Sequence, residues 1–318
     1  MLGTFFIWAG SLLAVLILAL IGYVGYRYRY HMGQLPKPPY RHLEAKPTPA
    51  NWRDDEITFT WVGHSTILLN LFGTKILTDP VLGEKLGLRV AGVLHFGPTR
   101  FTPPALSFDE IGDIDLILLS HAHMDHVDVP SLRKLARRSI HVITAHNTSR
   151  LIQKMPFGSY EELQPRQKAT TQEGVTITAI PVRHWGNRFP WNRDYGYNGY
   201  IIEKNGVRIL YPGDTAYMSM ENLPEQFGQI DLVFMPIGAY KPDSYQMAHC
   251  TPEQAWQMFK ESGGRWLVPI HWNTFVLSRE PVDEPMQRLL TAAGEERDRI
   301  VMERQGETYS WPAKSYTT

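Results

Sequence analysis

The hydrophobic pattern divides the chain into an apolar N-terminal stretch and a long region of short, strand-like runs. Residues 1–26 carry no charged side chain, and FFIWAGSLLAVLILALIGYVGY provides the ~20 apolar residues that a helix needs to cross a bilayer. Aromatic residues such as Trp8 and Tyr26 stand near both ends, as at membrane interfaces. We therefore predict a transmembrane anchor over residues 1–30. The alternatives are a buried core helix and a cleavable signal peptide, whose basic start and cleavage site do not stand out here.

Residues 31–56 form a predicted linker that is rich in proline and basic side chains and has little hydrophobic periodicity. Between Arg27 and Arg53 the chain holds six Lys or Arg residues and a single Glu. Because basic flanks favour the cytoplasmic side of a membrane, we expect a single-pass protein with most of its chain in the cytoplasm. The basic stretch would then lie against anionic headgroups of the bilayer.

The region from Ile57 to residue 318 is predicted to be one domain that contains both strands and helices. Short β-like runs recur along it, namely ITFTWVG, STILLNLFG, KILTDPVL, IDLILLSH, IHVITAH, VTITAIPV, GYIIEKNG, VRILYPGD, IDLVFMPIG and RWLVPIHW. Helical patterns are fewer and fall at roughly 130–138, 147–154, 221–227, 252–262 and 282–293. This order predicts an α/β fold in which two sheets pack face to face and helices cover the outside.

The amino-acid composition excludes several kinds of partner and binding site. The chain has 32 basic and 32 acidic side chains, so no global field favours nucleic acid as a partner. Cys250 is the single cysteine, which excludes an intrachain disulfide and a thiolate-rich zinc site. A bound metal would therefore be held by nitrogen and oxygen ligands.

Such ligands are concentrated at the ends of predicted strands. LILLS runs into His121, ITAIPVR into His184, RILYPG into Asp214 and WLVPI into His271. Four strand ends of this kind can converge on one edge of a two-sheet fold.

The segment HAHMDH at residues 121–126 adds further ligands at closely spaced positions. An extended or turning backbone puts His121 and His123 on the same side. Asp125 and His126 follow as the chain turns, so they can face a second position a few ångströms away. Two metals about 3.5–4 Å apart would share a bridging anion.

HAHMDH, the lone His184 after a strand, YPGDT and IHW resemble, in this order, the ligand series of the metallo-β-lactamase superfamily. Within it, TWVGHSTILL, ILTDPVL, FGPTRF, PIGAYKP and PIHWNTF resemble the branch of N-acylphosphatidylethanolamine phospholipase D and its bacterial relatives. The similarity spans about residues 57–280. It implies an αββα sandwich of two mixed sheets with flanking helices, preceded here by the N-terminal helix.

The resemblance also implies which residues bind two zinc ions. One ion would be held by His121, His123 and His184, the other by Asp125, His126 and His271, and Asp214 would bridge them. Zinc suits imidazole and carboxylate ligands, but iron or manganese fit the same set. A shared water would lose a proton near pH 7, and Asp125 could orient the resulting hydroxide and relay its proton.

For histidines outside the ligand set, the sequence allows more than one role. We expect His64 in WVGHST to support the site from outside the ligand set. His249 would bind phosphate, act as an acid, or simply be placed by the helix that follows it. His95 falls where the resembling family builds its substrate cavity, although a packed loop histidine fits equally well. Cys250 is expected to be a small buried hydrophobe.

Together these features predict a membrane-anchored, zinc-dependent phosphodiesterase that hydrolyses N-acylphosphatidylethanolamine-like phospholipids by attack of a metal-bridging hydroxide on phosphorus. The anchor is a departure from mammalian members of the branch, which lack such a helix. The alternatives are a lactonase or soluble phosphodiester hydrolase with the same site, and a non-catalytic membrane-tethered binding or envelope protein. The expected partners are the lipid bilayer and its phospholipid, with no nucleic acid, and a homodimer is left open.

Overall fold

The computed structural model describes residues 2–90 and 94–312. The chain divides into two compact units, Met1–Lys37 and Pro38–Thr318, and each is considered by itself. The first unit is essentially helix α1 (Leu2–Gly33). Its segment Trp8–Gly33 has a mean hydropathy of 2.1, and its side chains from Trp8 to Tyr30 are solvent-exposed. The helix is thus long and apolar enough to span a membrane, a profile that a signal sequence shares.

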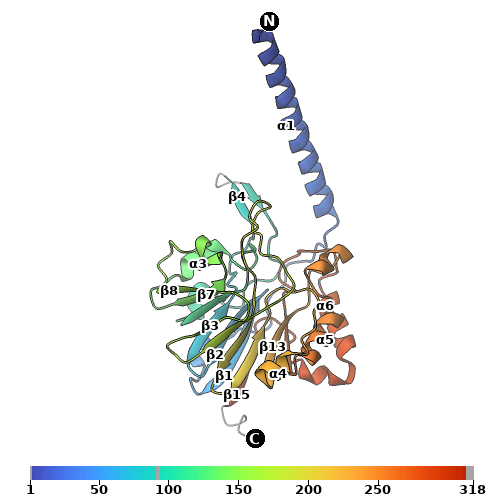
Figure 1. The fold of residues 1–318 in the computed structure, drawn as a ribbon. Helices are drawn as coiled ribbons and strands as arrows, with labels where there is room; N and C mark the ends of the chain where they lie inside the picture. Colours follow the sequence, from blue (N-terminus) through green and yellow to red (C-terminus); the bar gives the residue numbers. More distant parts are fainter. Residues whose placement is uncertain (1, 91–93, 313–318) are drawn as a thin grey trace. The chain divides into compact units, whose positions relative to one another are not determined.

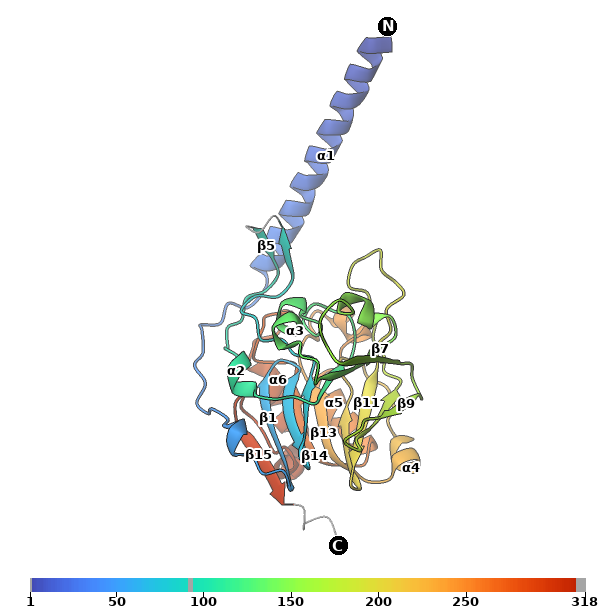
Figure 2. The ribbon, with the colours of Figure 1, turned by 90° about the vertical axis from the view of Figure 1, so that its left-hand side faces the viewer.

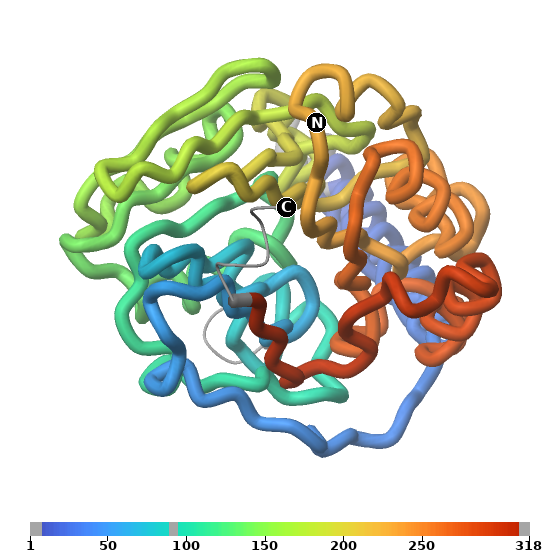
Figure 3. Tube along the Cα trace, turned by 90° about the horizontal axis from the view of Figure 1, so that it is seen from below, coloured from blue at the N-terminus to red at the C-terminus, as the bar shows by residue number. Residues whose placement is uncertain are grey.

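The second unit is built on two mixed sheets. The first has the strand order β15 (Thr308–Pro312), β1 (Glu56–Gly63), β2 (Thr66–Leu71), β3 (Thr74–Thr78), β6 (Leu116–Leu119), β7 (His141–Ala145) and β8 (Ser159–Leu163). The second has the order β14 (Gly264–Ile270), β13 (Ile230–Pro236), β12 (Val207–Tyr211), β11 (Gly199–Lys204), β10 (Thr176–Ile180) and β9 (Lys168–Thr170). A separate hairpin pairs β4 (Leu88–Val90) with β5 (Leu94–Phe96). Figure 3 shows the red C-terminal segment returning to the blue N-terminal strands, as the β15–β1 pairing requires.

Helices flank both sheets. The α-helices are α2 (Phe108–Ile111), α3 (Val129–Leu135), α4 (Leu223–Phe227), α5 (Pro252–Glu261) and α6 (Glu284–Ala293), and the 3₁₀ turns are η1 (Pro49–Asn51), η2 (Thr148–Leu151), η3 (Asp243–Met247) and η4 (Gly294–Arg299). In Figure 1, α3 lies on one side of the sheets, and α5 and α6 lie on the other. The layer order is therefore αββα, and the predicted fold class is confirmed.

The pattern of side chains along β6 shows why the layers stack in this way. Leu116 and Leu118 belong to the hydrophobic cluster between the two sheets, whereas Ile117 and Leu119 belong to a second cluster that includes Leu132 of α3. Successive strand residues point to opposite faces, so a strand that is covered on both faces is a continuous apolar run. The run LILL predicted this strand for that reason.

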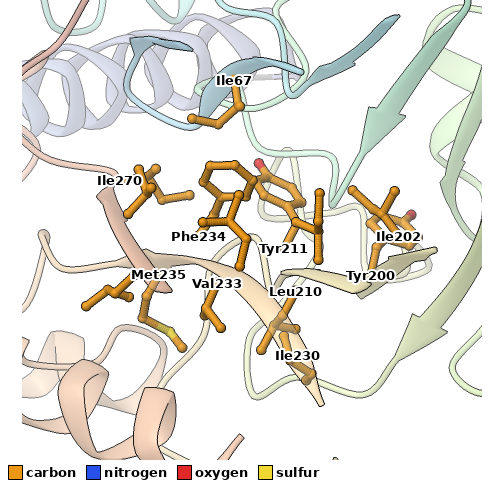
Figure 4. Packing of buried hydrophobic residues seen from close by; sticks show 14 of the residues in the cluster. Ile67, Tyr200, Ile202, Leu210, Tyr211, Ile230, Val233, Phe234, Met235 and Ile270 are labelled. Carbon is orange, nitrogen blue, oxygen red and sulfur yellow. The ribbon is translucent and has the colours of Figure 1, made fainter. Parts of the chain in front are cut away.

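The core between the sheets is rich in aromatic side chains. Phe59 of β1 and Phe234 of β13 meet edge to face, with ring centroids 5.4 Å apart. Figure 4 shows Ile67 of β2 pointing toward Phe234 and Tyr211 of the second sheet. This packing fixes the two sheets against each other and hence the spacing of the strand ends that carry the site.

Part of the predicted linker belongs to the compact unit rather than leading to it. The Arg41 guanidinium makes two hydrogen bonds of 2.8 Å with the Asp283 carboxylate, and the Arg41 backbone N–H donates to the carbonyl of Phe101. The compact unit therefore begins at Pro38, whereas the sequence placed the domain start near Ile57. Proline-rich composition indicated an extended backbone, but it did not show that polar side chains would tie this backbone to the body.

Two other local expectations differ from the structure. The predicted helix at 147–154 is only the 3₁₀ turn η2, because Asn147 adopts a left-handed φ of 62° and Pro156 follows closely. Strands β8, β9 and β15 were not predicted. Their polar or very short sequences, such as KAT in β9, lack a clear apolar period, and each lies at the edge of a sheet.

Candidate metal centre

The strand ends that carry the predicted ligands meet at one end of the two sheets. The structure brings three imidazoles together there: His121 Nε2 lies 2.9 Å from His123 Nδ1, and His184 Nε2 lies 3.2 Å from the same atom. His121 follows β6 of the first sheet, and His184 follows β10 of the second. This histidine triad therefore joins the two halves of the sandwich.

A second group of side chains lies beside the triad. Asp125 Oδ2 is 3.7 Å from His126 Nε2 and 3.5 Å from His271 Nε2. His64 also belongs to this group, and one ligand atom from each of the four residues lies within 4.8 Å of the others.

Asp214 stands between the two groups. Its Oδ2 is 3.1 Å from Nε2 of both His126 and His271, and 3.9 Å from His184 Nε2. All seven predicted ligands are thus brought to one place, in the two groups that the resemblance implied. Their role as ligands stays a prediction.

The unsatisfied polar atoms at this place fit a cation. Asp214 Oδ1 and His271 Nε2 are buried and have no hydrogen-bond partner among the described residues. In the triad, nitrogens of three imidazoles face one another, although a neutral imidazole offers only one proton. Lone pairs directed toward a common point are the arrangement that metal ions need, so the residues present fit a metal centre.

Two imidazoles are oriented by partners on their other nitrogen. His126 donates its Nδ1–H to Asp79 Oδ2 at 2.6 Å, and His184 donates its Nδ1–H to the carbonyl of Ala248 at 2.9 Å. In both cases the Nε2 atom is the one that points into the centre. Such partners fix the tautomer and the ring orientation of metal-binding histidines.

Asp79 belongs to the candidate site, although the sequence did not single it out. Its carboxylate is fully buried and accepts hydrogen bonds from the Ser120 backbone and hydroxyl, from Tyr211 and from His126. A signal was present, because KILT in β3 ends directly in Asp79 just as other strands end in ligands.

The charges of the centre are strongly coupled. Burial alone would raise the pKa of the Asp214 carboxyl, but the neighbouring His126 and His271 hold it well below its usual range. Burial alone would lower the pKa of His126, but the carboxylates of Asp214, Asp125 and Asp79 raise it well above its usual range. Ionised carboxylates in so dry a place attract a cation strongly.

His249 and His95 occupy different positions. His249 Nδ1 is buried without a partner and lies 3.8 Å from Asp214 Oδ2, at the wall of a cavity. His95 is half-buried on β5 and is not among the residues lining this cavity, although Phe96 and Gly97 are. Contacts of either histidine with substrate stay predictions.

The cavity has a volume of about 380 Å³ and opens beside Asp125 and Asp214. Its apolar lining includes Leu86, Phe96, Pro98, Met124, Trp185 and Leu277. No Lys or Arg is present among the described residues that line it. The Trp185 ring stacks on His184 with centroids 5.2 Å apart and remains 48% exposed, so it forms part of the entrance.

Two loops project from the end of the compact unit where the cavity opens. Figure 2 shows the β4–β5 hairpin and the yellow-green loop after β10 rising from the same end. Phe96 of the hairpin is 48% exposed, and Trp191 of the loop is 76% exposed. Apolar side chains are therefore presented to solvent close to the candidate site.

The two-sheet fold and the His/Asp centre define a metal-dependent hydrolase. A family model described as the Beta-lactamase superfamily domain matches residues 74–272, and the chain belongs to this superfamily. The superfamily membership that the sequence motifs predicted is thereby confirmed.

Individual proteins are similar to the chain over most of its length. An uncharacterized protein of Mycobacterium tuberculosis is 31% identical over 269 residues, which cover 80% of this chain and 71% of that protein. The N-acyl-phosphatidylethanolamine-hydrolyzing phospholipase D 1 of Caenorhabditis elegans is 27% identical over 250 residues, or 72% of this chain and 68% of that one. A metallo hydrolase from the archaeon Ignicoccus hospitalis has a similar fold, with a TM-score of 0.57 and 20% identity over 80% of this chain and 98% of its own.

Proposed function

We propose that this hydrolase is a phosphodiesterase of the phospholipase D type that acts on N-acylphosphatidylethanolamine-like phospholipids at a centre of two zinc ions. The observation that carries the proposal is the apolar cavity beside Asp125 and Asp214. A site for a soluble phosphate ester or sugar phosphate would be expected to offer Lys or Arg to the anion. A phospholipid instead needs apolar walls for its chains, with its phosphodiester at the centre. The similarity to the Caenorhabditis elegans phospholipase gives independent support for the same substrate class.

In the proposed mechanism, metals held by His121, His123, Asp125, His126, His184, Asp214 and His271 would supply the Lewis acidity for polarising a phosphoryl oxygen and for making a water molecule nucleophilic near neutral pH. The chain supplies the positioning. Asp125 presents a carboxylate that accepts a proton from the attacking water. His249, whose side chain lines the cavity, hydrogen-bonds a substrate oxygen. Trp185 and Phe96 line the cavity and give it apolar walls beside the reacting groups.

We further propose that α1 anchors the chain in the membrane and that the compact unit Pro38–Thr318 lies on the cytoplasmic side. The proposal rests on the length and apolar composition of α1 and on the basic residues that follow it. An anchor would keep the enzyme at the surface where its phospholipid is found.

The test compares two tryptophans of one loop in the full chain, purified in detergent. Trp185 lines the cavity, whereas Trp191 is exposed and does not. Burying an acyl chain against an indole contributes on the order of 1–2 kcal/mol, so Trp185→Ala should raise KM for N-acylphosphatidylethanolamine about tenfold. Trp191→Ala should leave KM for detergent-dispersed substrate unchanged. If lactones or soluble phosphodiesters are hydrolysed while the lipid is inert, the phospholipase proposal is wrong and the metal centre serves another substrate.

A further inference from the structure

His64 occupies an unusual position in the turn between β1 and β2. It is 1% exposed and has a left-handed φ of 55°, a conformation that few non-glycine residues adopt. Its neighbours in the sequence give no reason for a polar ring at this depth, since Trp61 and Ile67 on either side belong to the apolar core. A buried polar ring in a strained backbone conformation indicates that the surrounding structure requires it there.

The backbone of His64 is tied to the segment that carries His271. The His64 carbonyl accepts hydrogen bonds from the His271 N–H at 2.9 Å and from the Trp61 indole N–H at 2.7 Å. The His64 N–H donates to Thr274 Oγ1 at 2.8 Å. The β1–β2 turn of the first sheet is thereby fastened to the end of β14 in the second.

The side chain of His64 reaches a different ligand. Its Nε2 lies 3.1 Å from Asp125 Oδ2, so the ring can donate its Nε2–H to that carboxylate. The ring is held by aromatic neighbours on two sides. The His271 ring is 4.1 Å away, and Phe275 meets it edge-on at 5.5 Å.

We propose that His64 is a positioning residue for the metal that Asp125, His126 and His271 would hold. His64 sets the geometry of two of these ligands at once. Its Nε2–H fixes Asp125 Oδ2 and thereby the orientation of the whole carboxylate, while its carbonyl fixes the backbone of His271. The inference rests on the proposed ligand set and is independent of the lipid substrate. Since Nε2 is used as a donor to Asp125, His64 acts through the ligands and does not bind the metal itself.

The test uses two replacements that face the same backbone constraint. Gln offers an N–H near the position of the imidazole Nε2, whereas Phe keeps a ring of similar size without a donor. Each full-chain variant in detergent is loaded with zinc, and the two dissociation constants are measured by competition with a chromogenic chelator. Thermal melting of each zinc-loaded variant checks that it is folded.

His64→Phe should weaken one of the two zinc sites about 10–100-fold, the usual effect of losing a partner of a metal ligand, and leave the other unchanged. His64→Gln should recover most of that loss. Equal zinc affinities in wild type and His64→Phe would overturn the proposal, as would a Gln variant as weak as the Phe variant. Complete loss of one zinc from both variants, even at excess metal, would make His64 a ligand and also overturn it. Because no substrate is used, the outcome is separate from that of the lipid assay.

Discussion

Replacing Asp79 with Asn tests how strongly a residue outside the ligand set controls the metal centre. Asp79 Oδ2 accepts hydrogen bonds from His126 Nδ1 at 2.6 Å, Tyr211 Oη at 2.6 Å and Ser120 Oγ at 2.5 Å, and Oδ1 accepts from the Ser120 N–H at 2.8 Å. Asn has the same shape and tolerates the positive φ of 32° at this position. Its amide, however, has only one oxygen. Whichever way the amide is turned, its NH₂ group faces at least one buried donor.

The size of the effect follows from this geometry. A hydrogen bond to a charged group contributes about 1.5–3 kcal/mol, and a buried donor left without an acceptor costs about 1–3 kcal/mol. We therefore expect Asp79→Asn to lower the free energy of unfolding by about 2–3 kcal/mol, which corresponds to a loss of several degrees in Tm. The His126 tautomer is no longer enforced by a carboxylate, so metal affinity should fall about 10–100-fold.

The assay is chelator competition for bound zinc together with thermal melting. Asp115→Asn is the matched control, because Asp115 Oδ2 accepts one backbone hydrogen bond from Lys75 at the opposite end of β6 from His121. The single oxygen of Asn can still accept this one bond, so the control should keep both its stability and its metal affinity. If Asp79→Asn binds zinc as tightly as the wild type does, the argument that Asp79 orients His126 is refuted.

Three further predictions concern other parts of the chain. His123→Ala removes the nitrogen that lies 2.9 Å from His121 and 3.2 Å from His184, so turnover should disappear while the melting temperature changes little; unchanged hydrolysis would contradict a two-metal mechanism. Deleting residues 1–37 should leave a unit that binds metal and cleaves dispersed substrate, and loss of bound metal would show that α1 is needed by the body. Cys250 is 1% exposed, and burial raises the pKa of its thiol, so iodoacetamide at pH 8 should modify it only after unfolding; inactivating alkylation of the native protein would instead indicate a nucleophile.

The sequence predicted most residues of the candidate metal centre because they lie close together in the chain or directly follow a strand. His121, His123, Asp125 and His126 lie within six positions, and His271 directly follows the apolar run of β14. Two mixed sheets could likewise be predicted, since strands buried on both faces are continuous apolar runs.

Residues that act through contacts between distant segments could not be placed in the same way. His64 meets Asp125 and the backbone of His271 only because the β1–β2 turn of one sheet lies against the end of β14 in the other. The role of Asp79 depends on donors from Ser120, Tyr211 and His126. Sequence periodicity gives the face of a strand on which a residue lies, but not the partner that packing brings to it.

The most direct test of the proposed function is to count the metal bound to the full chain in detergent and to incubate the same preparation with N-acylphosphatidylethanolamine, ordinary phospholipids and lactones. The proposal predicts about two bound zinc ions, a number set by the two groups of ligands, together with release of phosphatidic acid from the N-acylated lipid. Metal-loaded protein that leaves every lipid intact, with or without hydrolysis of lactones, would contradict the phospholipase assignment.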